Sequence, residues 1–257
     1  MLLVRPPQWS QLPDLLKTLD RGRVVLVSSA MVYGAWPNNS VPIDESAVLR
    51  PNPGHAEAAS AAEAERRARR WLHAGDGREL VVLRPVPVVA PGLAPPAHLP
   101  LVDSLAPLQF LHPADLESAV DHAARVAPGT YNVAPDGSVD ADTARALVRG
   151  MATPGLPRKV AHLVAGWSGR LSAPAGVSFS VFPWVVDNHR LKDSGWAPEH
   201  SSDEAWVTAY PGSELAELPA GRRQKVVLAL ATSAFALVGA VIVEVLRRRR
   251  HQDELSE

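Results

Sequence analysis

Short runs of apolar residues in the first half of the chain alternate with a long segment of helical character. Residues 24–27 (VVLV) and 80–83 (LVVL) are uninterrupted apolar runs, which are typical of parallel strands covered on both faces. Residues 56–72 lie between them, are rich in strong helix formers and become basic toward their end, which predicts a helix. A strand, a helix and a second strand in this order form the crossover unit of a parallel sheet. We therefore expect an α/β fold.

Weaker patterns extend this arrangement in both directions. Residues 2–4 form a candidate short strand, and residues 12–19 have helical spacing. Residues 113–126 are a predicted helix with a proline in its first turn. The segment GTYNVAP at residues 129–135 predicts a further strand, and residues 140–149 predict another helix. The expected elements thus continue the alternation of strands and helices.

Residues 226–246 differ from the rest of the chain because Glu244 is their only charged residue. A helix that crosses a bilayer needs about 20 apolar residues, so the segment predicts a C-terminal transmembrane helix rather than a buried or amphipathic one. Residues 212–225 would then be a linker and residues 247–257 a charged tail. Basic residues flank the segment on both sides, so the positive-inside rule does not fix its orientation. No earlier segment could carry a large domain across, so we expect a single-pass tail anchor with residues 1–211 in the cytoplasm.

Composition excludes several classes of function. The 26 basic and 27 acidic side chains nearly cancel, so the chain lacks the overall positive field with which proteins neutralise nucleic-acid phosphates. Cysteine is absent, which excludes disulfides, thiolate nucleophiles and zinc–cysteine sites. His112 and Asp115 lie close in sequence, but nothing around them supplies the third ligand of a catalytic zinc site. We therefore expect no nucleic-acid partner and no metal, and assign these two residues to ordering a loop-to-helix junction.

Seven short motifs occur in a fixed order between residues 24 and 200. They are SSAMVYG (residues 28–34), PIDESAVLRP (42–51), AEAE (62–65), LRP (83–85), FLHPAD (110–115), YNV (131–133) and LKDSGWAP (191–198). Together they resemble the later part of an extended short-chain dehydrogenase/reductase of the NAD-dependent epimerase/dehydratase group. The resemblance implies a Rossmann-like parallel sheet with a small α+β substrate lobe.

The resemblance also implies ligands. Enzymes of this group use NAD or NADP and act on nucleotide sugars or similar small molecules. Ser29 aligns with the serine or threonine that hydrogen-bonds the substrate, although a hydroxyl at a strand end is also a common turn or helix cap. Tyr33, Arg84 and Pro85 fall near the cofactor by the same resemblance, although a packed core tyrosine is the simpler interpretation of Tyr33. Family members often form dimers through the active-site helix, so the resemblance leaves an oligomer as one of the alternatives for this chain.

The active-site helix departs from the family pattern at two positions. In the family a tyrosine four residues before a lysine handles the proton, while the lysine lowers the tyrosine pKa and holds the nicotinamide ribose. Counting back from AEAE places Glu57 at the tyrosine position and Ala61 at the lysine position. Alanine carries no charge, and an ionised glutamate is a base rather than the acid that the phenol provides. Since proton transfer contributes about 10²–10⁴ in rate, we predict that ordinary family catalysis is lost.

The glycine turn of the family is the second departure. The G-x-x-G-x-x-G pattern, which holds the pyrophosphate at a helix N-terminus, does not occur in this sequence. In the strand order 3-2-1-4-5-6, residues 24–27 correspond to the fifth strand and residues 1–4 at best to the fourth. We therefore expect a partial Rossmann-like sheet that lacks the first strands and has an unpaired edge. Such a chain alone would bind no NAD or NADP, and the turn would come from a segment outside this sequence or from a partner chain.

Two functional hypotheses follow. The first is a degenerate, noncatalytic protein tethered to the membrane through residues 226–246, with a nucleotide-sugar-like small molecule as its ligand. The alternative is an NAD(P)-dependent nucleotide-sugar epimerase, dehydratase or oxidoreductase whose cofactor-binding segment is missing from this sequence. His55 and Glu57 could form a substitute acid–base pair, although solvated loop and helix residues are the simpler interpretation. Four arginines of the same helix form either a solvated face or a contact with anionic lipid headgroups, namely Arg66, Arg67, Arg69 and Arg70.

Overall fold

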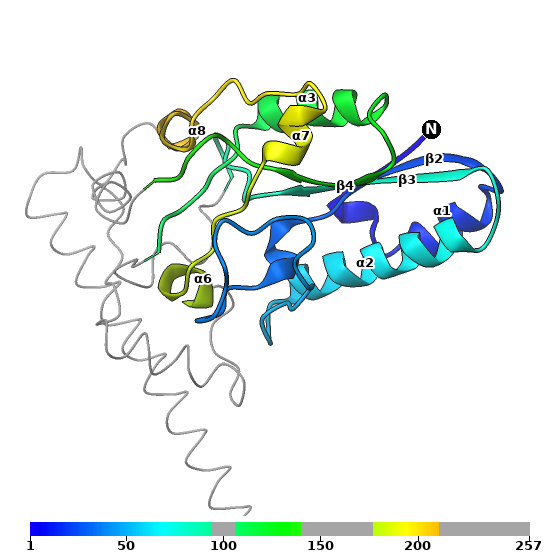
Figure 1. The fold of residues 1–257 in the computed structure, drawn as a ribbon, viewed down its shortest axis with the longest axis horizontal. Helices are drawn as coiled ribbons and strands as arrows, with labels where there is room; N and C mark the ends of the chain where they lie inside the picture. The colour runs from blue at the N-terminus through cyan, green and yellow to red at the C-terminus, as the bar shows by residue number, and fades with distance from the viewer. Residues whose placement is uncertain (94–105, 140–176, 211–257) are drawn as a thin grey trace, which may run out of the picture.

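A four-stranded parallel sheet lies at the centre of the molecule (Figure 1). The computed structural model describes residues 1–93, 106–139 and 177–210. In this part of the chain the strands follow one another across the sheet in chain order, and each neighbouring pair is parallel. The strands are β1 (Leu2–Val4), β2 (Gly22–Val27), β3 (Arg78–Pro85) and β4 (Gly129–Val133). The α/β class and the parallel sheet expected from the sequence are confirmed.

Helices cover both faces of the sheet (Figure 1). On one face lie α1 (Leu12–Lys17) and α2 (Ala56–His73), and on the other lie α3 (Pro113–Ala123) and α7 (His189–Asp193). Because alternate side chains of a strand point to opposite faces, β2 and β3 are apolar on both sides, and Val24 is fully buried. The remaining helices in the described residues are η1 (Pro6–Gln8), η2 (Ala30–Tyr33), α6 (Val177–Val181) and α8 (Ser202–Ala209).

The long helix α2 packs an alanine-rich face against the sheet. Small side chains allow a helix to approach the strands closely, and the buried ones are Ala58, Ala61, Ala62, Ala64 and Ala68. The helix begins after His55, whose Nδ1 accepts a hydrogen bond from the Ala58 backbone N–H at 3.2 Å. Near its other end, Trp71 Nε1 donates to the Leu19 carbonyl at 2.8 Å, in the turn that follows α1. His55 thus caps the start of α2, and Trp71 ties its other end to the turn after α1.

A second and smaller apolar cluster lies beside α8. Trp206 packs against Phe110 with 4.8 Å between ring centroids. Ser202 Oγ also accepts a hydrogen bond from the Phe110 backbone N–H at 3.1 Å. A capping box starts the helix, because Ser201 and Glu204 each accept the other's backbone N–H. The helix is therefore attached to the segment before α3 rather than to the central sheet.

Some element boundaries differ from those predicted. β3 extends beyond the apolar run at residues 80–83, because the residues that flank the run continue the ladder. Arg78 and Glu79 pair with β2, and Arg84 and Pro85 pair with β4. α3 ends at Ala123 rather than at residue 126. There the Arg23 side chain donates to the carbonyls of Ala123 and Val126, at 3.1 and 2.7 Å, which satisfies groups left free by the end of the helix.

Several predicted segments lie outside the described residues: the helix at 140–149, the linker at 212–225, the transmembrane helix at 226–246 and the tail at 247–257. Within the described ranges, no helix combines the length and the apolar character needed to cross a membrane. Across those same ranges β1 pairs only with β2, so it forms one edge of the sheet, and the lack of the first strands stays a prediction.

Candidate functional site

Polar residues gather where β2, β3 and β4 end. Ser28 and Ser29 follow β2, Arg84 is the penultimate residue of β3, and Asn132 is the penultimate residue of β4. In open parallel sheets, ligands bind in the crevice beyond the carboxyl ends of the strands. The carboxyl edge of the sheet is therefore the candidate ligand-binding site.

A buried ion pair joins α2 to β3. Arg84 Nε lies 2.9 Å from Glu65 Oε1, and Arg84 Nη2 lies 2.7 Å from Glu65 Oε2, so the pair is bidentate. Ser28 Oγ donates to the same Glu65 Oε1 at 2.7 Å. Glu65 is completely buried and Arg84 is 2% exposed. Burial disfavours the charged guanidinium, but the hydrogen bonds and charge of Glu65 outweigh this and raise the pKa of Arg84.

Tyr33 extends this network to β4. Its hydroxyl accepts a hydrogen bond from Arg84 Nη1 at 2.7 Å and donates to Asn132 Oδ1 at 2.7 Å. The Arg84 guanidinium also lies 4.8 Å from the centre of the Tyr33 ring. Burial raises the pKa of Tyr33 to about 12. The phenol therefore stays neutral at physiological pH.

The three residues predicted near a cofactor occupy structural positions. Tyr33 and Arg84 direct their polar groups at each other, at Glu65 and at Asn132. Pro85 is buried at the end of β3, beside Val133 of β4, and has no N–H to offer a ligand. Their role in cofactor binding stays a prediction, whereas their contribution to the scaffold is visible in these contacts.

The three positions predicted for catalysis are not alike. Ser29 is 7% exposed and caps η2, because its Oγ accepts from the Met31 backbone N–H at 3.2 Å. Glu57 is exposed in the first turn of α2. Ala61, one turn later on the same helix, is completely buried. Glu57 and Ala61 thus point to different environments, and the geometry does not place a proton-transfer pair at them.

Sequence reasoning gave no role to Glu65, Ser28 or Asn132, although all three are central to the network. A signal existed for Glu65. It follows Ala58, Ala61 and Ala62 at helical spacing, so it lies on the buried face of α2. A glutamate on an apolar helix face needs a cationic partner, and Arg84 in a neighbouring buried strand was available.

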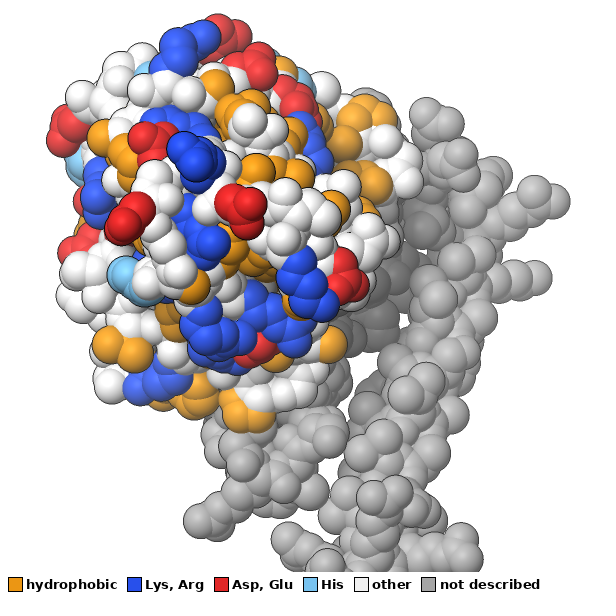
Figure 2. Space-filling model, turned by 90° about the vertical axis from the view of Figure 1, so that its right-hand side faces the viewer, with side chains coloured by type: hydrophobic (Ala, Val, Ile, Leu, Met, Phe, Trp, Pro, Cys, Tyr) orange, Lys and Arg blue, Asp and Glu red, His pale blue; other side chains and the backbone are white. Residues whose placement is uncertain are grey.

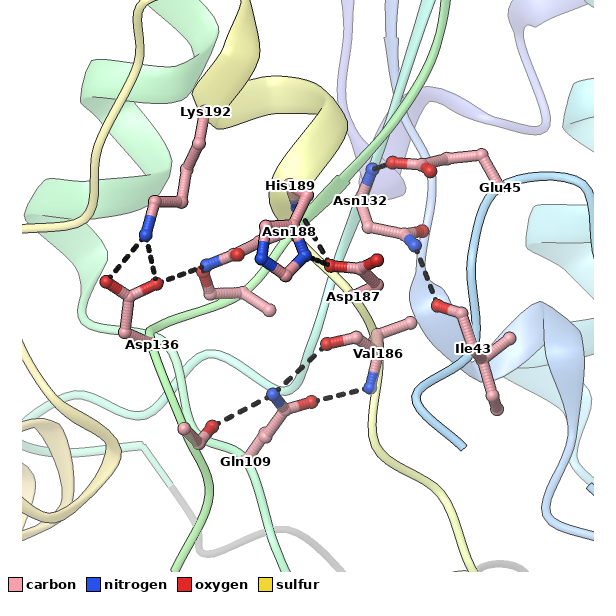
Figure 3. Close-up of polar contacts among 12 residues, drawn as sticks. Ile43, Glu45, Gln109, Asn132, Asp136, Val186, Asp187, Asn188, His189 and Lys192 are labelled. Atoms are coloured by element: carbon pink, nitrogen blue, oxygen red, sulfur yellow. Dashed lines mark hydrogen bonds and ion pairs between the residues drawn. The ribbon is translucent and has the colours of Figure 1, made fainter. Parts of the chain in front are cut away.

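A second polar cluster ties the segment before α7 to the end of β4 (Figure 3). Asn188 Nδ2 donates to the Ala134 carbonyl and to Asp136 Oδ1, both at 2.9 Å. Lys192 Nζ lies 2.9 Å from each oxygen of Asp136. The hydrogen bond from Asn188, followed by that from Lys192, lowers the pKa of Asp136. Asp187 and His189 form a further contact at the exposed start of α7.

Two amides join distant loops to this cluster (Figure 3). Gln109 bonds the backbone of Val186 twice, accepting from its N–H at 2.8 Å and donating to its carbonyl at 3.3 Å. Asn132 Nδ2 donates to the Ile43 carbonyl at 3.1 Å, and its backbone N–H donates to Glu45 Oε1 at 2.7 Å. These bonds fix the loops on either side of the site, and they leave the polar groups engaged with the protein itself.

His112 and Asp115 order the start of α3, as predicted. His112 Nδ1 accepts from the Ala114 backbone N–H at 3.2 Å and caps the helix. Asp115 is buried and accepts the backbone N–H groups of Glu199 and His200, at 3.0 and 3.2 Å. The His200 ring stacks on His112 with centroids 3.8 Å apart. In the ranges that the structure describes, no group of three His, Cys, Asp or Glu side chains could hold a metal ion.

The cap of α2 predicts a pH dependence of stability. His55 Nδ1 can accept the Ala58 N–H only while the ring is neutral, and burial lowers the pKa of His55. The folded-state pKa lies below the unfolded value near 6.5. The contribution of the His55 cap to the free energy of unfolding is therefore fully present above about pH 6.5 and is lost as the pH falls toward the folded-state pKa. We expect His55→Asn, which caps without titrating, to lose less stability than the wild type between pH 7.5 and 5.5 in urea unfolding. His73→Asn, at the exposed end of the same helix, is the control, and equal losses in wild type and His55→Asn would contradict the assignment.

Comparisons with known proteins give the context of this site. No protein-family model matches the chain, and no curated protein sequence matches it. Among solved structures, RMD from Pseudomonas aeruginosa complexed with NADPH is 20% identical with a TM-score of 0.55, over 78% of this chain and 71% of that one. UDP-glucuronic acid 4-epimerase from Bacillus cereus with NAD is 14% identical with a TM-score of 0.55, over 79% and 65%. MoeE5 with UDP-glucuronic acid and NAD is 18% identical with a TM-score of 0.57, over 82% and 78%. At these identities the likeness is one of fold.

Proposed function

We propose that this chain, whose fold is that of NAD-dependent UDP-sugar epimerases and dehydratases, is a noncatalytic protein that keeps their scaffold and is held at a membrane. The observation that carries the proposal is the complete burial of Ala61 at the position expected for the catalytic lysine. An ammonium group there would need both space and water. The neighbouring inner-face residues Ala58 and Ala62 are buried as well, so the surroundings of this position are apolar core.

We further propose that neither Glu57 nor Tyr33 takes over this proton transfer. Glu57 is exposed and lies at the start of α2, apart from the buried network. Tyr33 is a tyrosine near the strand ends, but its hydroxyl is held between Arg84 and Asn132, and its pKa near 12 keeps it neutral. A noncatalytic role accounts for a chain that keeps the parallel sheet and the buried network at its strand ends, while different residues stand at the predicted acid–base positions.

The membrane and ligand parts of the proposal rest on the sequence and on the neighbours. The apolar residues 226–246 supply the tether, which would leave the large domain in the cytoplasm. Structural neighbours were solved with UDP-glucuronic acid or UDP-glucose together with NAD, so a nucleotide-sugar-like molecule is the ligand class to test. We propose that such a molecule binds without redox turnover and that the chain alone holds no NAD or NADP.

The alternative is an active NAD(P)-dependent enzyme that receives its cofactor-binding turn from elsewhere. Two observations favour testing it. Ser29 lies at the carboxyl end of β2, one residue beyond Ser28, and several structural neighbours contain NAD or NADPH. In this alternative Ser29 would hydrogen-bond the substrate in addition to capping η2.

A hydride-transfer assay on the full chain in detergent micelles, run with the chain alone and again with a cell lysate that can supply the missing cofactor-binding turn, separates the two functions. UDP-glucose or UDP-glucuronic acid is supplied with NAD⁺ or NADP⁺, and the absorbance of reduced nicotinamide and the formation of epimeric sugar are followed. We expect neither signal to exceed that of the same mixture without the chain, because the proton-transfer positions are occupied by Glu57 and Ala61. Saturable turnover that Ser29→Ala abolishes would overturn the noncatalytic proposal and establish the alternative.

A further inference from the structure

Three arginines of α2 share one carboxylate. Arg66 Nη2 lies 2.7 Å from Glu63, Arg67 Nε lies 2.8 Å from it, and Arg70 Nη2 lies 3.5 Å from it. The three side chains are 58%, 36% and 65% exposed, so they remain accessible from solvent. Figure 2, which looks at the side of the molecule where α2 ends, shows blue side chains gathered in its lower part with few red ones among them. We call Arg66, Arg67 and Arg70 the basic face of α2.

Intramolecular interactions do not account for the whole basic face. The helix dipole favours cations only within the last turn, which includes Arg70 but not Arg66 or Arg67, since α2 ends at His73. The single Glu63 neutralises one of three positive charges. Arg69 is different, because its Nη2 donates to Thr130 Oγ1 at 2.9 Å and approaches Glu65, so it belongs to the scaffold.

We propose that the basic face of α2 lies against the anionic headgroups of the membrane to which the chain is tethered. This inference rests on the proposed tether, which keeps the domain near a bilayer. An extended linker over residues 212–225 would reach about 45–50 Å, enough for the domain to turn any face toward the surface. Phosphate groups at a lipid surface complement guanidinium groups that have only one carboxylate among them.

Electrostatics sets the expected size of the effect. A basic residue near an anionic leaflet strengthens binding roughly fivefold, so two uncompensated charges give roughly a twenty-fivefold preference over a neutral bilayer. The attraction acts within about 8–10 Å at physiological salt, so only residues close to the surface contribute. Nucleic acid is the less favoured partner, because the net charge of −1 and the confinement of the patch to half a helix supply few phosphate contacts.

The absence of cysteine makes a direct test straightforward. The full chain carrying His73→Cys, at the end of α2, is labelled with a fluorophore and reconstituted into vesicles that contain a nitroxide-headgroup quencher. A second labelled variant, Ala114→Cys, reports from α3 across the sheet. Vesicles of phosphatidylcholine are compared with vesicles that also contain phosphatidylglycerol. We expect phosphatidylglycerol to increase quenching at residue 73 and to leave residue 114 unchanged.

Two triple variants identify the cause. Arg66→Gln/Arg67→Gln/Arg70→Gln removes the charge and keeps good helix formers, and we expect it to abolish the added quenching. Replacing the same three residues by lysine keeps the charge and should retain most of it. Both variants are checked by urea unfolding, and unchanged midpoints exclude a folding defect as the cause.

The remaining outcomes separate this inference from the tether. Flotation of the vesicles in a density gradient shows whether the protein is bound to them. If the protein floats with both kinds of vesicle and phosphatidylglycerol does not change the quenching at residue 73, the proposed lipid contact of the basic face is overturned while the tether stands. Flotation only with phosphatidylglycerol, lost in the glutamine variant, supports the basic face and overturns the tether. Flotation with neither overturns both. Binding to a DNA duplex but not to vesicles, lost in the glutamine variant, overturns the lipid proposal in favour of nucleic acid.

Discussion

Replacing Arg84 by methionine will lower the free energy of unfolding by about 3–5 kcal/mol, because it leaves the fully buried Glu65 without its bidentate partner. Arg69 compensates only in part, since its guanidinium is 3.5 Å from Glu65 and nearly half exposed. The Tyr33 hydroxyl loses a donor but keeps its bond to Asn132. Urea unfolding followed by circular dichroism measures the change.

Two further variants make this prediction specific to the buried pair. Glu65→Leu combined with Arg84→Met should recover most of the loss, because removing both charges leaves no unpaired ion in the core. Lys17→Met breaks the exposed pair with Asp14 and should leave the unfolding midpoint within error of the wild type. If Arg84→Met unfolds at the same urea concentration as the wild type, the network does not stabilise the fold.

Placing a lysine at residue 61, where the resemblance predicts the family lysine, will also destabilise the protein: Ala61→Lys should cost roughly 3–5 kcal/mol, because it buries an unpaired charge and overfills a packed interface. Ala61 is completely buried on the inner face of α2. We expect a large fall in the urea midpoint and no gain of NAD(H) binding, measured by the fluorescence of the reduced cofactor.

The matched control for this variant is Ala59→Lys. Ala59 lies on the same helix, half a turn away and exposed, so the same side chain finds solvent there. We expect its unfolding midpoint to stay near that of the wild type, since lysine is a good helix former. A stable Ala61→Lys protein would mean that the position still accommodates the lysine, and the noncatalytic proposal would lose its main support.

The local elements could be predicted because their causes are local. The apolar runs at 24–27 and 80–83 became β2 and β3, and the alanine-rich segment became α2, since periodicity and propensity act over a few residues. The order of motifs also gave the parallel α/β fold. Boundaries failed where a distant side chain decided them, as at the end of α3, where Arg23 of β2 bonds the last carbonyls.

The site was predicted less completely. The motifs located Ser29, Tyr33 and Arg84 at the strand ends, and counting along the helix located Glu57 and Ala61. They did not reveal that Tyr33 and Arg84 bond each other and Glu65, because the partners are far apart in the chain. His55 was considered for acid–base chemistry, and the structure places it as the cap of α2 instead.

By itself, the sequence determined that this protein has parallel strands and an alanine-rich crossover helix, and it predicts that Glu57 and Ala61 stand at the family's proton-transfer positions. Only the tertiary structure decided that Ala61 is sealed in the core and that Arg84 is shared between Glu65 and Tyr33. The physical reason is the range of the interactions. Backbone geometry repeats every few residues, whereas the pairing of buried charges depends on which strand ends meet across the sheet.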